Sequence, residues 1–333
     1  MILISFGTRP EWIKIKPVIS LLRDDQYHIL FTGQHTTLLE NELDGIKNLS
    51  KISTTNQATN RLDNVVVNCL SNFPDNLPVT SVLVQGDTAS AYAISLAAFH
   101  RKIPIIHLEA GLRTYDIENP YPEESYRRAI SCVSAINLCA TKTSMMNLVS
   151  EKAPGKNFVV GNTVLDNLNG IRPKYGNKIL VTLHRRENHS VMRDWFMEVE
   201  RLATLYEEYD FLMPIHPNPS VLKHKDVLKR VKVVDPMPHK ELIDYMSNCR
   251  FIITDSGGLQ EESSFLSKKS IVCRKETERV EGLGKFSFLC ESPDKLQKLF
   301  EFVNSDHIVT GNCPYGDGKS SQKIKNIIEN EQL

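Results

Sequence analysis

The sequence lacks a charge excess, a long apolar run and a paired cysteine motif. Forty basic residues balance forty acidic ones, so no global electric field favours nucleic acid or a membrane surface as a partner. No stretch approaches the ~18 apolar residues of a membrane span, and the start of the chain does not resemble a secretory signal. The seven cysteines are scattered without a CxxC pair, as in reduced cytosolic proteins. We therefore expect a cytoplasmic protein that binds neither nucleic acid nor membrane.

The sequence also lacks the short motifs of several enzyme classes. It has no GxGxxG followed by a ribose-binding acid and no GxxxxGK[ST], which disfavours a nicotinamide-dependent enzyme and a P-loop enzyme. No HExxH and no clustered His, Cys and carboxylate spacing suggests a metal, and no GxSxG elbow suggests a serine nucleophile. We predict that the protein needs no cofactor and no metal.

What the sequence does contain is a repeated alternation of short apolar runs and helical patterns. The 333 residues exceed the ~250 to 300 at which single cores stop growing, so two domains are expected. The apolar runs predict buried strands at 1–6, 28–32, 79–85, 103–108, 136–139, 178–183, 210–215, 231–234, 250–254 and 270–274. Helical patterns between them, such as 11–23 and 89–100, indicate parallel sheets with helices on both faces. The predicted fold class is α/β with two doubly wound domains, 1–169 and 170–333, divided at a linker that mixes Gly, Pro and charge.

Polar clusters follow the predicted strands at their carboxyl ends, where open parallel sheets bind ligands. In chain order they are GTRPE (7–11), QGDT (85–88), EAGLR (109–113), HRREN (184–188), HPNP (216–219) and DSGG (255–258). Because three of them lie in each predicted domain, we expect them to line one cleft between the domains.

Carboxylates suited to proton transfer stand at or near three strand ends. Asp87 and Glu109 each follow an apolar run, and Glu123 opens a helix after NPYP (119–122). Asp87 and Glu123 also have a structural interpretation, as a helix cap and as a first-turn charge. Neither explanation applies to Glu109, and a buried carboxylate suits general acid or base chemistry near neutral pH.

Two segments could bind phosphate. After the strand at 250–254, the glycines of DSGG lead into a predicted helix whose first amides could hold a diphosphate. The alternative is that Asp255 or Ser256 merely caps that helix. In the first domain Arg9 could hold phosphate oxygens bidentately, with Lys14 close by on the same helix, although charges in a first helical turn are common.

Two histidines end apolar strands of the second domain. A lone histidine is usually structural, but His184 and His216 occupy equivalent strand ends, and Arg185 and Arg186 follow the first of them. This arrangement favours a role in ligand binding or catalysis. The residues together indicate an enzyme that binds a phosphorylated, nucleotide-linked ligand, but they do not name the sugar or the reaction.

Taken together and in this order, the motifs resemble those of the non-hydrolysing UDP-N-acetylglucosamine 2-epimerases. The resemblance runs over nearly the whole chain, from FGTRPE (6–11) to PYGDG (314–318), and includes DSGGLQEE (255–262) and TER (277–279). It implies a GT-B type fold with an interdomain cleft, a homodimer, and a final helix near 320–331 that returns to the first domain. The implied reaction interconverts UDP-N-acetylglucosamine and UDP-N-acetylmannosamine, by anti elimination of UDP to 2-acetamidoglucal and re-addition, without nicotinamide or metal.

The resemblance also implies roles for individual residues. The family's catalytic positions are occupied by Asp87, Glu109, Glu123 and His184, and its UDP-binding positions by His216, Ser256, Gly257, Gly258 and Glu262, with Arg279 a further candidate. The helix start would take the diphosphate and Glu262 the ribose hydroxyls. We place Arg9 and Lys14 with the UDP-binding residues, and expect His184 and Arg9 to stabilise the departing diphosphate. Gln34 matches a site where some bacterial relatives bind a second substrate molecule as an activator, but Thr37 replaces the second glutamine of that site.

Two residues depart from the family pattern. Trp12 and Val280 stand where a small residue and a proline are usual. An epimerase for another UDP-acetamido sugar, such as a diacetamido uronic acid, is therefore an alternative interpretation. A GT-B glycosyltransferase would share the fold and the UDP site, and a hydrolysing relative would release free N-acetylmannosamine. A sugar-nucleotide sensor without turnover is disfavoured because the catalytic-type residues are present.

Overall fold

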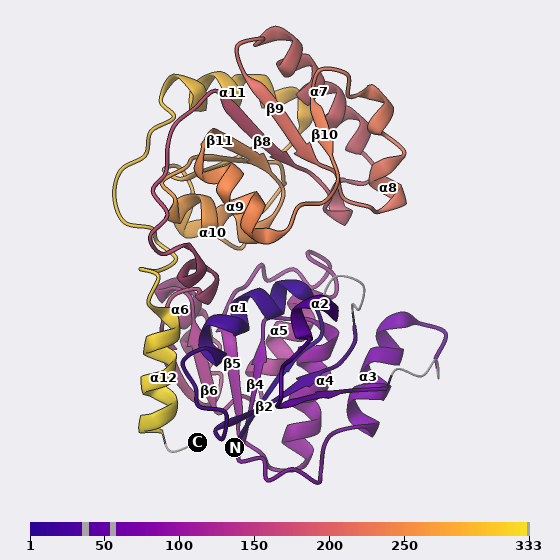
Figure 1. Cartoon of the computed structure of the whole chain (residues 1–333), viewed down its shortest axis with the longest axis vertical. Helices are drawn as coiled ribbons and strands as arrows, with labels where there is room; N and C mark the ends of the chain where they lie inside the picture. Colours follow the sequence, from indigo (N-terminus) through magenta and orange to yellow (C-terminus); the bar gives the residue numbers. More distant parts are fainter. Residues whose placement is uncertain (35–39, 54–57, 332–333) are drawn as a thin grey trace. The chain divides into compact units, whose positions relative to one another are not determined.

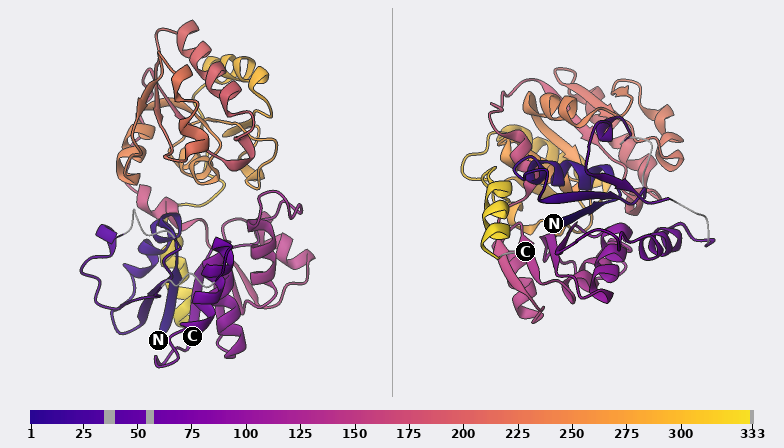
Figure 2. Two further views of the ribbon diagram at one scale, coloured as in Figure 1. Left: turned by 90° about the vertical axis from the view of Figure 1, so that its right-hand side faces the viewer. Right: turned by 60° about the horizontal axis from the view of Figure 1, so that its bottom comes forward.

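Two parallel β-sheets organise the chain in the computed structural model, which describes residues 1–34, 40–53 and 58–331. Unit 1 comprises Met1–Asn167 and Gly318–Leu333, and unit 2 comprises Leu168–Asp317. Helices cover both faces of each sheet (Figure 1 and Figure 2). The predicted fold class, α/β with two doubly wound sheets, is confirmed.

The sheet of unit 1 has seven parallel strands in the order β3-β2-β1-β4-β5-β6-β7. Their bounds are β1 Ile2–Phe6, β2 Tyr27–Phe31, β3 Leu49–Lys51, β4 Ser81–Gln85, β5 Ile105–Ala110, β6 Ile136–Cys139 and β7 Lys156–Val159. Every residue of β1 and β4 is buried, which is why these strands are largely apolar in the sequence. The winding direction reverses between β1 and β4, so the topological switch point, where such folds bind ligands, lies at the carboxyl ends of these two strands.

Two hydrophobic cores hold helices against the two faces of this sheet. The helices of unit 1 are α1 Arg9–Ile19, α2 Glu40–Leu43, α3 Arg61–Ser71, α4 Ala89–His100, α5 Glu123–Ser131, α6 Lys142–Ser150 and α12 Ser320–Asn330, with the 3-10 helix η1 Thr163–Leu168. One core includes Ile15 of α1 and Ile324 of α12, and the other includes Ile94 of α4 and Ile130 of α5. The alanine-rich helix α4 is buried over most of its surface because α3 and α5 flank it.

Polar side chains near the end of η1 hold both α1 and the C-terminal helix. Pro17 lies inside α1 and has no N–H to donate to the carbonyl of Ile13, and the Asn167 side chain donates to that carbonyl instead, at 3.1 Å. The Asp166 carboxylate accepts from the backbone N–H groups of Ser320 and Ser321, at 3.0 and 2.7 Å. The start of α12 is thereby fastened to unit 1, beside α1.

The sheet of unit 2 has six parallel strands in the order β10-β9-β8-β11-β12-β13. Their bounds are β8 Lys178–Thr182, β9 Asp210–Pro214, β10 Lys232–Val234, β11 Cys249–Thr254, β12 Ser270–Val272 and β13 Ser287–Leu289. The helices are α7 Met192–Leu205, α8 Pro219–Leu222, α9 His239–Ser247, α10 Gly257–Phe265 and α11 Leu296–Ser305, with 3-10 helices η2 Arg186–Asn188, η3 Lys225–Val227, η4 Val280–Gly282 and η5 Pro293–Lys295. Here the winding direction reverses between β8 and β11.

The core of unit 2 is aromatic around Phe300 of α11. Its ring packs against those of Phe211 on β9 and Phe251 on β11, and Trp195 of α7 is buried in the same cluster. This packing fixes the strands whose carboxyl ends carry the polar motifs of the unit. Among the described helices, none combines the length and the apolar content needed to cross a bilayer.

Candidate active site

Glu11 fastens together two of the polar turns at the switch point of unit 1. Its Oε2 accepts from the backbone N–H of Gly7 at 3.1 Å and from the hydroxyl of Thr8 at 2.7 Å. Its Oε1 accepts from the hydroxyl of Thr88, which caps α4, at 2.8 Å. The turn after β1 and the turn after β4 therefore share one buried carboxylate. Burial raises the pKa of this carboxyl to about 7.

Glu109 has an unusual backbone conformation at the end of β5. The pairing with β6 shifts register between Leu108 and Ala110, so Glu109 is the extra residue of a β-bulge. Its φ of 66° is left-handed, a conformation that a non-glycine residue rarely adopts and that tends to occur at functional sites. The bulge turns the Glu109 side chain away from the regular alternation of the strand.

Three side chains donate hydrogen bonds to the Glu109 carboxylate. Lys14 of α1 donates from Nζ to Oε2 at 2.5 Å, and Gln85 at the end of β4 donates to the same oxygen. Asn162 donates to Oε1 at 3.3 Å. The carboxylate is 7% exposed, so these bonds replace the water that burial removes. The structure thus brings the predicted residues Lys14 and Glu109 into direct contact.

Asp87 is held by Arg127, which the sequence analysis did not single out. The Arg127 guanidinium donates to Asp87 Oδ2 from Nε at 2.9 Å and from Nη2 at 2.5 Å, and from Nη1 to Glu124 at 3.2 Å. Glu123 begins α5, four residues before Arg127, and is partly buried. The interpretation of Asp87 as a helix cap is therefore wrong, because Thr88 caps α4 and the Asp87 carboxylate instead accepts from a buried arginine. One sequence signal could have pointed to Arg127: it lies three residues after Glu124 on the same helix, a spacing at which side chains can pair.

Arg9 and Gln34 have other partners at the edge of this site. Arg9 Nε lies 3.4 Å from Glu42 Oε1 of α2. Gln34 Oε1 accepts from the backbone N–H and the hydroxyl of Ser90, at 3.1 and 2.8 Å, in the first turn of α4. Thr37, the other residue of the predicted activator site, lies outside the described residues.

His107 supports the same region from inside the sheet. Its Nε2 lies 2.8 Å from the carbonyl oxygen of Gly86, the residue before Asp87. Burial lowers the pKa of the His107 ring to about 4, so the ring is neutral at pH 7 and its Nε2–H donates to the carbonyl. This bond holds the turn that carries Asp87.

In unit 2 the two predicted histidines lie against each other. The rings of His184 and His216 stack with centroids 5.1 Å apart and planes 15° apart. Burial lowers the pKa of the His184 ring despite the nearby Asp255 carboxylate. His216 Nδ1 accepts from the backbone N–H of Asn218 at 3.2 Å. The strands β8 and β9 are neighbours in the sheet, so the two histidines that follow them lie in contact.

The start of α10 has no side-chain cap. Asp255 Oδ2 instead accepts from the backbone N–H groups of His184 and Arg185, both at 2.8 Å. Ser256 is the N-cap residue by position, but its side chain makes no capping hydrogen bond. The interpretation that Asp255 or Ser256 merely caps this helix is therefore wrong. The first amides of α10 remain available to an anion, which the helix dipole also favours.

The glycines of DSGG differ in what surrounds them. A Cβ on Gly257 would lie 2.6 Å from Nη1 of Arg279, whereas a Cβ on Gly258 would meet nothing within 4 Å. Only glycine thus lets the Arg279 guanidinium approach the start of α10. Arg279 Nε donates to Glu261 Oε1 at 2.8 Å, and Nη1 donates to Glu278. The structure brings the predicted residue Arg279 to the predicted phosphate-binding helix.

Behind the start of α10 lies a buried network of ion pairs that the sequence did not predict. Arg274 donates to Glu187 Oε1 at 2.7 Å and to Glu278 Oε2 at 3.0 Å. Glu278 therefore bridges Arg274 and Arg279. The two glutamates belong to the HRREN and TER motifs, but their pairing depends on how the strands bring those motifs together. Glu262, on the next position of α10 after Glu261, contacts His239 at 2.5 Å.

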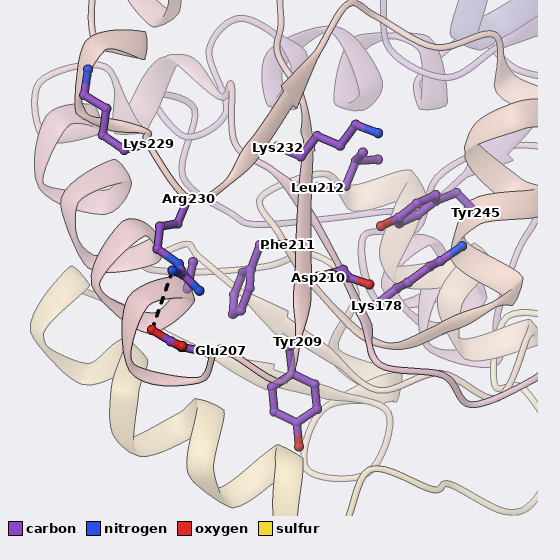
Figure 3. Close-up of a pocket in the computed structure, with 11 residues that line it drawn as sticks. Lys178, Glu207, Tyr209, Asp210, Phe211, Leu212, Lys229, Arg230, Lys232 and Tyr245 are labelled. Atoms are coloured by element: carbon purple, nitrogen blue, oxygen red, sulfur yellow. Dashed lines mark ion pairs between the residues drawn. The ribbon is translucent and has the colours of Figure 1, made fainter.

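A groove of about 640 Å³ lies at the end of the unit 2 sheet that is opposite to the polar motifs (Figure 3). Lys178, Asp210 and Lys232 line it and are the first residues of their strands, so it opens at the amino ends rather than the carboxyl ends. Its basic side chains point in different directions, and Arg230 pairs with Glu207 at 3.5 Å. Its chemistry is therefore separate from that of the predicted site. Over the described residues, no three His, Cys, Asp or Glu side chains are grouped so as to hold a metal ion.

Two doubly wound sheets, with carboxylates in one unit and an uncapped, arginine-flanked helix start in the other, are suited to an enzyme that binds a phosphorylated ligand. Residues 21–329 match the family model described as UDP-N-acetylglucosamine 2-epimerase. The chain belongs to this epimerase family, as its motifs predict, and the family consists of isomerases.

Known members are similar over their full lengths. The UDP-N-acetylglucosamine 2-epimerase of Campylobacter jejuni is 35% identical, over 98% of this chain and 97% of its own. The crystal structure of the Neisseria meningitidis UDP-GlcNAc 2-epimerase bound to UDP-GlcNAc matches with a TM-score of 0.86 at 32% identity, over 99% of each chain. The Methanocaldococcus jannaschii UDP-GlcNAc 2-epimerase in complex with UDP-GlcNAc and UDP matches with a TM-score of 0.83 at 28% identity, over 99% of each chain. The predicted GT-B type of fold is confirmed by these similarities.

Proposed function

We propose that this protein interconverts UDP-N-acetylglucosamine and UDP-N-acetylmannosamine by inverting carbon 2 of the sugar. The observation that carries the proposal is the buried carboxylate of Glu109, which accepts from Lys14, Gln85 and Asn162 next to the switch point of unit 1, on a residue with a left-handed backbone conformation. Inversion next to the anomeric carbon requires groups that remove and return a proton. The family relationship supplies the substrate class, and the Neisseria relative was crystallised with UDP-GlcNAc.

Unit 2 is proposed to bind UDP. The amides of Gly257 and Gly258 at the start of α10, with the Ser256 hydroxyl and Arg279 beside them, are suited to the diphosphate. Glu262 is suited to the ribose hydroxyls because a carboxylate accepts hydrogen bonds. His216 completes the proposed UDP-binding residues of this unit. Preorganised donors of this kind stabilise the charge of a leaving group.

Unit 1 is proposed to transfer the protons. Removal of the carbon 2 proton and cleavage of the bond between carbon 1 and the diphosphate oxygen give 2-acetamidoglucal, and the electron pair of that bond leaves with UDP. Protonation of carbon 2 from the opposite face and re-addition of UDP at carbon 1 complete the inversion. The candidate acids and bases are Asp87, Glu109 and Glu123.

His184 and Arg9 are proposed to stabilise the departing diphosphate, with Lys14 near it. His184 ends β8 beside His216, and Arg9 opens α1 at the switch point of unit 1. In each unit the proposed residues stand at or just after the carboxyl ends of the parallel strands, where such sheets bind ligands.

The test is proton NMR of the purified protein with UDP-N-acetylglucosamine in deuterium oxide, without added metal or nicotinamide. We expect deuterium at carbon 2 while UDP-N-acetylmannosamine accumulates. Folded protein that binds UDP but leaves carbon 2 unexchanged would overturn the proposal. It would favour an epimerase for another UDP-acetamido sugar or a glycosyltransferase, which further UDP sugars and acceptors would separate.

A homodimer and a cytoplasmic location are part of the same proposal, because both are implied by the family resemblance. Light scattering coupled to size-exclusion chromatography measures the oligomeric state. A mass of one 37.8 kDa chain at micromolar concentration would contradict the dimer.

A further inference from the structure

Two helices of unit 2 meet in a short side-chain contact that the reaction chemistry above does not use. His239 is the first residue of α9, and Glu262 lies in the second turn of α10. His239 Nε2 lies 2.5 Å from Glu262 Oε1. The glutamate side chain is 4% exposed and that of the histidine 22%, so the pair lies at the edge of the buried interior with the histidine outside.

The direction of this hydrogen bond follows from the chemistry of the two groups. An ionised carboxylate only accepts, so Nε2 of His239 carries the hydrogen and donates it. A buried carboxylate needs such a donor to replace water. The preceding residue of α10, Glu261, receives its donor from Arg279. The two adjacent carboxylates of α10 therefore accept hydrogen bonds from different donors. Glu261 accepts from Arg279, which lies beside the start of the helix, and Glu262 accepts from His239.

We propose that His239 is a positioning residue for the ribose of the bound nucleotide and acts through Glu262. This inference rests on the proposed function, in which α10 binds UDP. His239 engages Oε1 and fixes the plane of the carboxylate, so that Oε2 accepts from a ribose hydroxyl.

The geometry of α10 agrees with this assignment. Glu262 follows Gly257 by five residues, which is about 7.5 Å along a helix axis at 1.5 Å per residue. That displacement is comparable to the span from the phosphates of a nucleotide to the hydroxyl edge of its ribose. A diphosphate on the first amides of α10 therefore leaves the ribose hydroxyls within reach of Glu262. Without the imidazole donor, the carboxylate would lose its fixed orientation.

The experiment compares UDP with 2′-deoxy-UDP, because only a ribose-directed residue changes the ratio of their dissociation constants. Titration calorimetry would measure both ligands with the full chain and with His239→Phe, His239→Gln, Glu262→Met and the double variant His239→Phe/Glu262→Met. Phenylalanine keeps the ring and removes the donor, glutamine restores a donor near the Nε2 position, and methionine keeps the length of Glu262 without an acceptor. Tryptophan fluorescence, from Trp12 in unit 1 and Trp195 in the core of unit 2, checks that each variant is folded.

We expect the parent to prefer UDP by roughly tenfold, the size of one hydrogen bond to a charged group. His239→Phe and Glu262→Met should both reduce this preference, the double variant should reduce it no further, and His239→Gln should restore most of it. A matched control is His224→Phe, since His224 is also partly exposed in unit 2 but has Arg193 and Asp226 as its charged neighbours. The control should keep the parental ratio.

The outcomes separate this inference from the function on which it rests. If Glu262→Met reduces the preference for UDP but folded His239→Phe does not, His239 has no positioning role, and the ribose assignment of Glu262 stands. If neither variant changes the ratio while the protein binds UDP, both assignments fail. A folded parent chain that does not bind UDP would overturn the proposed function itself.

Discussion

Glu11 should make the stability of unit 1 depend on pH. Burial raises the pKa of its carboxyl from 4.5 to about 7, against the opposing effect of hydrogen bonds from Thr8 and Thr88. The folded chain therefore holds this proton more tightly than the unfolded chain does. The stabilising contribution is complete below the unfolded pKa of 4.5 and is lost as the pH rises through about 7. At ~1.36 kcal/mol per pKa unit, the rise corresponds to about 3 kcal/mol of unfolding free energy.

The perturbation that isolates this effect is Glu11→Gln. Glutamine resembles the protonated acid, because it is neutral and keeps one acceptor and one donor for the hydroxyls of Thr8 and Thr88. Urea unfolding between about pH 4 and pH 8 would be followed for the parent and the variant. The chain has two tryptophans, Trp12 in unit 1 and Trp195 in unit 2, so a Trp195→Phe background makes the fluorescence specific to unit 1.

The expected result is a growing advantage of the variant as the pH rises. The unfolding free energy of Glu11→Gln minus that of the parent should increase by about 3 kcal/mol from pH 4 to pH 8. Glu118→Gln, which changes an exposed carboxylate of the same unit, should follow the parent at every pH. A difference between Glu11→Gln and the parent that stays constant across this range would refute the reasoning.

Three further substitutions test the site. Glu109→Gln should slow deuterium exchange at carbon 2 by roughly 10²- to 10⁴-fold, the usual contribution of a general acid or base, and normal exchange would remove Glu109 from the chemistry. Arg127→Met should lower kcat by about tenfold or more because Asp87 loses the guanidinium that holds it, with UDP affinity by calorimetry unchanged because Arg127 is not among the residues proposed to bind UDP. Gly257→Ala should weaken UDP binding by about tenfold, since its Cβ would displace Arg279, whereas Gly258→Ala should weaken it less; equal losses would contradict this account.

The sequence predicted the central strands of both sheets but missed three edge strands. The central strands are buried on both faces and appear as apolar runs, which is a local signal. The missed strands β3, β7 and β13 are short and stand at the ends of the strand orders, where most of each strand is not fully buried. Exposed edges tolerate polar residues such as Lys51 and Lys156, so apolar periodicity does not reveal them.

Residue identities at the candidate site could be predicted, but their pairing could not. The sequence places Glu109 at a strand end, yet nothing in it indicates the bulge, the positive φ or the three donors. Likewise Asp87 precedes α4 as a helix cap would, while its arginine comes from α5, forty residues later. Such contacts depend on which strand ends become neighbours in the sheet. The interpretation of Asp255 as a helix cap was wrong for the same reason, because its carboxylate accepts from backbone N–H groups of the loop after β8.

The cations of unit 1 link the proposed binding of the leaving group to proton transfer. Lys14 contacts Glu109 at 2.5 Å, and Arg9 lies 3.4 Å from Glu42. A diphosphate that attracts both cations must compete with these carboxylates. If it draws Lys14 away, Glu109 keeps the neutral donors Gln85 and Asn162 and gains proton affinity, because a neighbouring positive charge favours the ionised form. The carboxylate would then become a stronger base only when a substrate diphosphate is present. Calorimetry of UDP binding in buffers of different ionisation enthalpy measures the proton uptake that this exchange implies.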